Sequence, residues 1–283
     1  MDLDWKQILA LRSRFRSENF AGVFKYINKM LVFLEGGQSE IPVVLNEIFH
    51  TTPNLREITM AMPKCNNPEI FLAQNPKIGD DGMLLQLRIL TLVQVSAIRS
   101  IQSENSSLLN TICENIHHLR VFQCLHIETI GVHSTSTMSF SFLKKVHAHQ
   151  CPELQYLFTS SVAKKLVNLE EIIVEQCESL KEIVAKGGDE DEPKGEGEDK
   201  YENEMIFKKL ENLSLTSLPK FESFYTGTST MNFPSLRKVC VEKCYSAKVF
   251  RHRDKVPPKF TVAIDGFRGD KKSLIMQQFE EAS

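Results

Sequence analysis

The chain has 283 residues, of which 42% are hydrophobic and 25% charged, and its formal net charge of −2 gives a pI near 6.5. This balance lacks the basic excess of nucleic-acid-binding proteins, and no stretch approaches the roughly 20 apolar residues of a membrane span. The segment from Met1 to Trp5 has acids where a signal peptide needs basic residues, so we expect a soluble, cytoplasmic protein without nucleic-acid or membrane partners.

Apolar residues recur with the spacing L-x-x-L-x-L along most of the chain. In chain order, the first positions of these copies fall at Ile27, Leu55, Leu87, Leu119, Leu143, Leu169, Leu210 and Leu236. Three copies carry a cysteine at the ninth position, namely Cys151, Cys177 and Cys244. This is the spacing of a leucine-rich repeat, in which a short strand points its apolar side chains inward and the ninth residue closes a turn.

The segments between these strands predict short helices. Residues 41–49 carry a proline, Pro42, at a helix start, and serine pairs precede residues 108–113 and 162–166 in the manner of N-caps. We therefore expect an α/β leucine-rich-repeat solenoid. It is a horseshoe with short parallel strands on the concave face and irregular or short helical convex segments. Residues 1–26 are predicted to be an N-terminal cap or degenerate repeat, and residues 27–250 about eight irregular repeats.

The steps between successive first positions are 28, 32, 32, 24, 26, 41 and 26 residues. The longest step contains residues 187–204, with nine acids against two lysines, which predicts a disordered insertion. It is either an acidic contact for a basic partner or a tolerated loop expansion. After Phe250 the pattern stops, so residues 251–283 are predicted to be a linker and tail, with a capping strand near residues 260–264.

The seven cysteines are expected to remain thiols in a reducing compartment. Cys151, Cys177 and Cys244 share the ninth repeat position, and Cys124 is assigned to an inward sixth position. Each then has a packing or turn role that requires a thiol rather than a disulfide bridge.

The sequence predicts no catalytic, cofactor or metal site. His147 and His149 occupy outward positions five and seven, whereas Cys151 turns inward, so the three do not converge on one metal ion. Cys113 lies within helical reach of His117 or His118, but no third orienting group accompanies the pair.

The run from Leu166 to Ile183, followed by the acidic segment and the run from Phe207 to Phe221, resembles a known family. It is similar to the C-terminal leucine-rich-repeat region of plant coiled-coil nucleotide-binding disease resistance proteins, over roughly residues 27–250. The resemblance implies a module that senses a pathogen effector or a guarded host protein and restrains a nucleotide switch. No G-x-x-x-x-G-K-[ST] phosphate loop occurs, so we expect a fragment of a larger receptor or a truncated relative.

Outward positions three, five and seven locate a partner-binding surface. On this assignment four side chains form an exposed apolar patch that two basic ones border: Ile89, Val93, Val121, Leu125, Lys145 and His147. The alternatives are that a loop or another domain covers the patch, or that the array docks on a nucleotide-binding domain as an autoinhibitory module. A ubiquitin-ligase substrate adaptor of the F-box type is a weaker alternative, because the first 26 residues are too short for that box.

Overall fold

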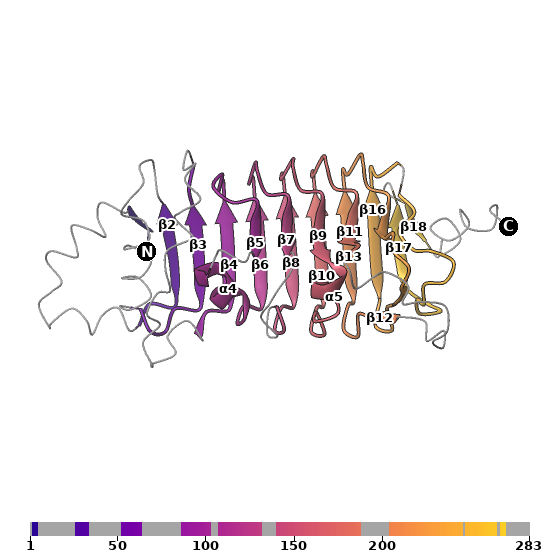
Figure 1. Ribbon diagram of the computed structural model, residues 1–283, viewed down its shortest axis with the longest axis horizontal. Helices are drawn as coiled ribbons and strands as arrows, with labels where there is room; N and C mark the ends of the chain where they lie inside the picture. The colour runs from indigo at the N-terminus through magenta and orange to yellow at the C-terminus, as the bar shows by residue number, and fades with distance from the viewer. Residues whose placement is uncertain are drawn as a thin grey trace, which may run out of the picture.

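The computed structural model describes residues 2–4, 26–33, 52–63, 86–102, 107–131, 140–187, 204–245, 247–264 and 267–269. The described residues form a solenoid of stacked parallel strands (Figure 1), which confirms the predicted leucine-rich-repeat fold. The predicted helix at residues 41–49 and almost all of the acidic segment lie outside the described residues.

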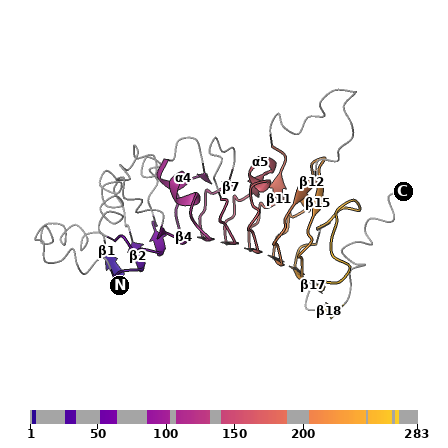
Figure 2. The same ribbon diagram turned by 90° about the horizontal axis from the view of Figure 1, so that it is seen from below.

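The main sheet has eleven strands, and all neighbours are parallel except the last pair. In spatial order they are β1 (Asp2–Asp4), β2 (Lys29–Phe33), β3 (Glu57–Ala61), β4 (Ile89–Val93), β6 (His118–Phe122), β8 (Lys145–His149), β10 (Glu171–Glu175), β13 (Asn212–Thr216), β16 (Lys238–Glu242), β17 (Thr261–Ile264) and β18 (Phe267–Gly269). Figure 2 shows this sheet along the inner side of a gently curved array. The predicted strand near residues 260–264 is confirmed as β17, which pairs with β16.

A second, five-stranded parallel sheet closes the opposite side of the solenoid. Its strands, in spatial order, are β14 (Ser223–Tyr225), β11 (Glu182–Ala185), β9 (Tyr156–Thr159), β7 (Thr129–Gly131) and β5 (Ser100–Gln102). The sequence analysis missed these strands, although a signal was present. Apolar residues recur at positions twelve and fifteen, such as Leu154 and Leu157 after Leu143, and both are fully buried.

Two short helices stand beside the second sheet, α4 (Ser107–Cys113) and α5 (Ser160–Ala163). The predicted serine cap of α5 is wrong, since Thr159 holds the N-cap position and makes no side-chain capping bond. The Ser160 hydroxyl instead accepts a hydrogen bond from the backbone N–H of Gly187 at 3.0 Å. The serine therefore joins two successive turns of the solenoid.

The sequence register of one repeat is wrong by three residues. β6 pairs with β4 so that Leu119 faces Leu90, at position four, and Val121 faces Leu92, at position six. The repeat therefore begins at Ile116 instead of Leu119, and Cys124 occupies position nine. The steps of 32 and 24 residues become 29 and 27, so the array is more regular than the sequence pattern suggested.

The ninth-position thiols perform the turn-closing role that the sequence predicts. The Cys151 thiol lies 3.6 Å from the backbone oxygen of Val121, in the preceding repeat, and 3.5 Å from that of His149. Cys244 lies 3.6 Å from the oxygen of Leu215 in the same way. The six cysteines that the structure describes are free thiols.

The C-terminal repeats have a different interior. Phenylalanine rings pack there with centroids 4.8 to 5.6 Å apart, in the contacts that join Phe207, Phe224, Phe233 and Phe250. A third, two-stranded sheet of β12 (Glu204–Ile206) and β15 (Thr230–Asn232) lies beside them. Phe140 and Phe158 also pack in the central repeats, with centroids 5.8 Å apart, so the C-terminal interior differs in having four phenylalanine rings in contact.

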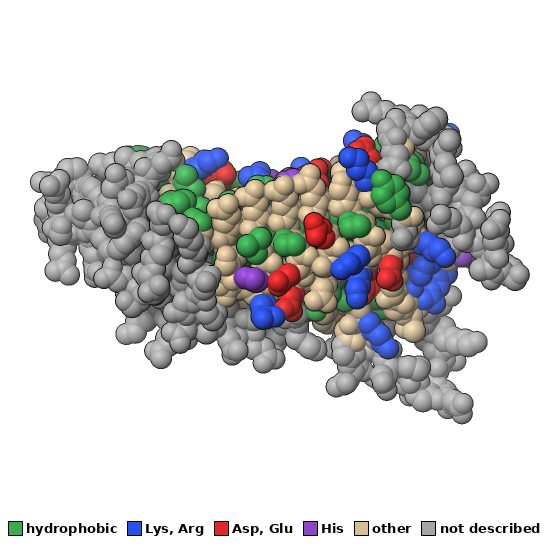
Figure 3. Space-filling model, turned by 90° about the horizontal axis from the view of Figure 1, so that it is seen from above, with side chains coloured by type: hydrophobic (Ala, Val, Ile, Leu, Met, Phe, Trp, Pro, Cys, Tyr) green, Lys and Arg blue, Asp and Glu red, His purple; other side chains and the backbone are tan. Residues whose placement is uncertain are grey.

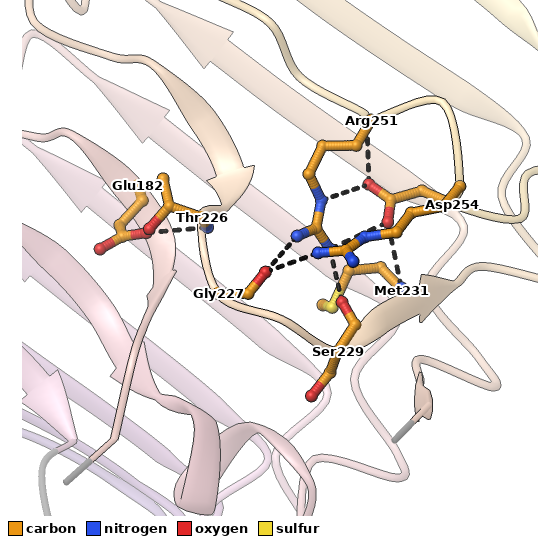
Figure 4. Close-up of polar contacts among 8 residues, drawn as sticks. Glu182, Thr226, Gly227, Ser229, Met231, Arg251 and Asp254 are labelled. Carbon is orange, nitrogen blue, oxygen red and sulfur yellow. Dashed lines mark hydrogen bonds and ion pairs between the residues drawn. The ribbon is translucent and has the colours of Figure 1, made fainter. Parts of the chain in front are cut away.

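Residues 251–255, in the segment predicted to be a linker, are anchored to the array. The buried Asp254 carboxylate accepts hydrogen bonds from the Arg251 backbone N–H at 2.8 Å and from the Met231 N–H at 3.1 Å (Figure 4). The Arg251 guanidinium lies 3.1 Å from the same carboxylate and donates to the backbone oxygens of Gly227 and Ser229. We call these contacts the Arg251–Asp254 lock.

Candidate partner-binding face

The middle of the inner sheet carries a chemically diverse set of outward side chains. Strands β6, β8 and β10 are in register, and their odd repeat positions alternate with buried ones. We define the central concave face by these half-buried residues: His118, Arg120, Phe122, Lys145, His147, His149, Glu171, Ile173 and Glu175. Its side chains offer cationic, anionic, aromatic and aliphatic contacts within three strands.

Ion pairs cross the strands of this face. The Lys145 ammonium lies 2.9 Å from the carboxylate of Glu171, directly opposite on β10. Arg120 reaches past β4 toward Glu57 on β3, at 3.8 Å, and Glu57 also lies 2.9 Å from Lys29. Such exposed pairs contribute at most about 1 kcal/mol each to stability, so their main effect is to orient the charges that a partner would meet.

Two histidines, a glutamate and a phenylalanine form a connected cluster. One carboxylate oxygen of Glu175 lies 3.1 Å from Nε2 of His147 and 3.4 Å from Nδ1 of His149. The Phe122 ring meets the His147 ring edge to face, with centroids 4.9 Å apart. This packing fixes the aromatic ring, a side-chain type enriched where proteins bind one another.

Positive charge is concentrated around His118. Burial, followed by the charges of Lys145 and Arg120, lowers the pKa of His118 below its usual value. The imidazole is therefore held in its neutral form near neutral pH. It can then donate from one ring nitrogen and accept at the other.

The structure separates the six residues predicted to contact a partner. Ile89, Val93, Lys145 and His147 lie on the inner face, half-buried, as the sequence analysis expected. Val121 is only 1% exposed and belongs to the core, because the register of β6 is shifted. Its neighbour Phe122 occupies the outward position. Leu125 is 51% exposed, but it lies in the turn beyond β6.

The environment of Cys113 opposes its use as a nucleophile. Cys113 is fully buried in α4, and burial raises the pKa of its thiol, which opposes formation of a nucleophilic thiolate. In the part of the chain that the structure describes, no three or more His, Cys, Asp and Glu side chains are placed to hold a metal ion. No helix among the described residues is long and apolar enough to cross a membrane.

Comparisons with known proteins agree with this geometry. The model of the leucine-rich repeats of plant disease resistance proteins of the RPS2-like type matches residues 131–178 and 167–250. A probable disease resistance protein of Arabidopsis thaliana is 29% identical over 182 residues, which cover 61% of this chain. The aligned part spans 23% of that relative's length.

The match includes β8, β10, β13 and β16, and with them the ninth-position residues Cys151, Cys177 and Cys244. It therefore confirms the resemblance that the sequence motifs carried, and the central concave face falls largely within the matched residues. Residues 131–250 are therefore similar to the leucine-rich repeats of plant disease resistance proteins.

Proposed function

We propose that this chain is a recognition module in plant defence, acting in the cytoplasm, and that its central concave face binds a protein partner. The observation that carries the proposal is the mixed chemistry of β6, β8 and β10. Arg120, Phe122 and Ile173 offer the arginine, aromatic and aliphatic groups that supply most binding energy at protein interfaces. A leucine-rich-repeat solenoid presents such groups on one extended surface, which suits recognition better than catalysis.

The proposed partner is a pathogen effector or a guarded host protein. A second possibility is the nucleotide-binding domain of a receptor that contains these repeats, with the array holding it inactive. The match to a disease resistance protein supports both forms of recognition equally. The F-box-type adaptor has no comparable support from the structure or from the family match.

A comparison of interaction partners between two matched variants tests the proposal. In the face variant, Arg120→Glu reverses a charge and Phe122→Ala removes the ring from the central concave face. The control variant makes the same kinds of change away from the strands, at exposed Lys220 (Lys220→Glu) and Val167 (Val167→Ala). Both should unfold at the same denaturant concentration as the unmodified chain.

Proteins captured from plant extract by each variant are then identified by mass spectrometry. We expect at least one defence-related protein to bind the unmodified chain and the control variant but not the face variant. Equal capture of every protein by the face and control variants would reject the central concave face as the contact surface.

A further inference from the structure

A groove lies outside the central concave face, along the edge where the main-sheet strands end. It has a volume of about 580 Å³, within the range of ligand sites in proteins. Two columns line it, from repeat positions eight and ten, together with Pro63 at position nine of the repeat that begins at Leu55. Figure 3 looks onto this edge, where neutral side chains and backbone form ridges across the middle, and Lys and Arg are most numerous towards the C-terminal end.

The position-eight column is a ladder of four glutamines. The Nε2 of Gln94 donates to the Oε1 of Gln123 at 3.1 Å, and Gln123 donates to Gln150 at 2.9 Å. Gln150 donates in turn to Gln176 at 2.8 Å. We call these four residues the glutamine ladder. All its carboxamides point the same way along the array, and its hydrogen bonds are exposed to solvent.

The backbone holds each rung in place. All four glutamines have a positive φ of 52° to 54°, a conformation that side chains other than Gly, Asn and Asp seldom adopt. Each backbone N–H donates to a carbonyl of the next main-sheet strand, as Gln150 does to Glu175 at 3.0 Å. Ser217 and Lys243 have the same backbone conformation in later repeats. The turn therefore does not require glutamine, and the carboxamides are an additional feature of these four repeats.

The ladder leaves regular hydrogen-bonding groups for a ligand. A carboxamide has two N–H donors and two acceptor lone pairs, and an internal rung such as Gln123 uses one of each in the ladder. One donor and one acceptor per internal rung remain, repeated about every 4.8 Å along the sheet. The position-ten column adds apolar contacts from Leu125 and Pro152, with one carboxylate, Glu178. Among the residues that the structure describes, no Lys or Arg lines this groove.

From these features we infer that the groove binds an extended, uncharged polypeptide segment that carries Gln or Asn side chains. Such a segment offers the paired donors and acceptors that the rungs already exchange with one another, as amide ladders do between stacked strands. Three strand spacings give the ladder a length of about 14 Å, which four or five extended residues span. A segment rich in carboxylates is disfavoured, because the described lining of the groove presents Glu178 and no Lys or Arg side chain.

The test uses two capped pentapeptides, acetyl-(Gln)5-amide and acetyl-(Glu)5-amide, which differ only in carboxamide against carboxylate. Binding to the full chain at pH 7 is followed by NMR, through the side-chain NH2 signals of the ladder. We expect the Gln peptide to bind and to shift these signals, and the Glu peptide to bind at least about tenfold more weakly, which corresponds to about 1.4 kcal/mol.

The matched variant changes Gln123→Ser and Gln150→Ser, the residue that Ser217 shows the turn accepts. It should keep the unfolding midpoint of the unmodified chain and lose binding of the Gln peptide about tenfold. The Arg120→Glu, Phe122→Ala face variant should bind the peptide normally, so failure of the groove and failure of the proposed function give different results. Absence of Gln-peptide binding, equal binding of the Glu peptide, or ladder-dependent binding of cellohexaose instead of the peptide would overturn the inference.

Discussion

The central repeats, from β6 to β11, and the C-terminal repeats, from β12 to β17, both contribute strands to the main sheet but differ in the side-chain contacts that hold them together. In the central part the same groups recur at every rung, with Cys124, Cys151 and Cys177 at position nine. In the C-terminal part Cys244 keeps this position and its contact, and the Arg251–Asp254 lock is added, which joins residues 22 to 24 positions apart along the chain.

The comparison shows two ways of stabilising a solenoid. Repeated contacts divide the stability among many similar small increments, as nearest-neighbour repeat arrays do. A single buried ion pair concentrates its effect, because loss of one partner leaves the other charge buried without compensation. The proposed binding face lies entirely on the repeated, distributed part.

The largest effect is expected from a charge placed in the core of the central repeats. Val121→Glu buries a carboxylate in the apolar interior and should destabilise the chain by more than about 4 kcal/mol. Phe122→Glu, one residue away on the outward side, should cost less than about 1 kcal/mol. Urea unfolding of the two variants measures the difference. A larger loss of stability in Phe122→Glu than in Val121→Glu would support the register that begins at Leu119.

The next largest effect concerns the lock. Asp254→Ala leaves the Arg251 guanidinium without its carboxylate and the Met231 N–H without an acceptor. We expect a loss of about 3 to 5 kcal/mol in the free energy of unfolding, measured by urea denaturation. Asp254→Asn, which keeps an acceptor oxygen, is the control and should lose less. A loss below about 1 kcal/mol in Asp254→Ala would show that the C-terminal repeats do not depend on the lock.

A smaller effect is expected for one rung of the central cysteines. Cys151→Leu removes the thiol donor and leaves the buried oxygen of Val121 without that contact, at a cost of about 1 to 3 kcal/mol. Cys151→Asn keeps a donor and should lose less. Thermal unfolding compares the pair, and equal losses would argue that position nine acts through its volume alone.

The smallest effect is pH dependent and links the two regions. Burial raises the pKa of Glu182, although its carboxylate accepts hydrogen bonds from the Thr226 hydroxyl at 2.7 Å and from its N–H at 3.2 Å. A raised carboxyl pKa favours folding below the unfolded-state pKa, and this contribution disappears as pH rises through the folded-state pKa.

Glu182→Gln keeps the acceptor and removes the ionisation. The variant should therefore gain stability relative to the unmodified chain between about pH 4 and 7. Because Glu182 is partly exposed, the gain should be under about 1 kcal/mol. Urea unfolding of both proteins at the two pH values measures this gain. A variant that loses stability relative to the unmodified chain as the pH rises would contradict the prediction.

Periodic residues made the main sheet predictable from the sequence. The ninth-position cysteines fixed the register at Leu143, Leu169 and Leu236, and those repeats have the strands that the template predicts. At residues 116–124 two registers fit the apolar template, since Leu119, Phe122 and Cys124 satisfy it as well as Ile116, Leu119 and Val121 do. The alignment of Cys124, Ile127 and Ile130 with Cys151, Leu154 and Leu157 of the next repeat separates the two registers. Without this alignment Phe122 was missed as a surface residue.

The remaining features depend on contacts between distant residues. The Arg251–Asp254 lock consists of contacts of Arg251 and Asp254 with Gly227 and Met231, and no local sequence pattern predicts these contacts. Glutamine recurs regularly at position eight. The placement of its carboxamides in a ladder depends on the positive φ of each turn, which the template does not specify. The ion pairs of the binding face likewise follow only once the strands are in register.

Amide hydrogen exchange in Asp254→Ala tests most directly whether the binding face is independent of the C-terminal lock. The account predicts that amides in β12, β15 and residues 251–255 lose their protection, while those in β6, β8 and β10 exchange as slowly as in the unmodified chain. A uniform loss of protection through all of these strands would contradict it, because the array would then unfold as a single unit.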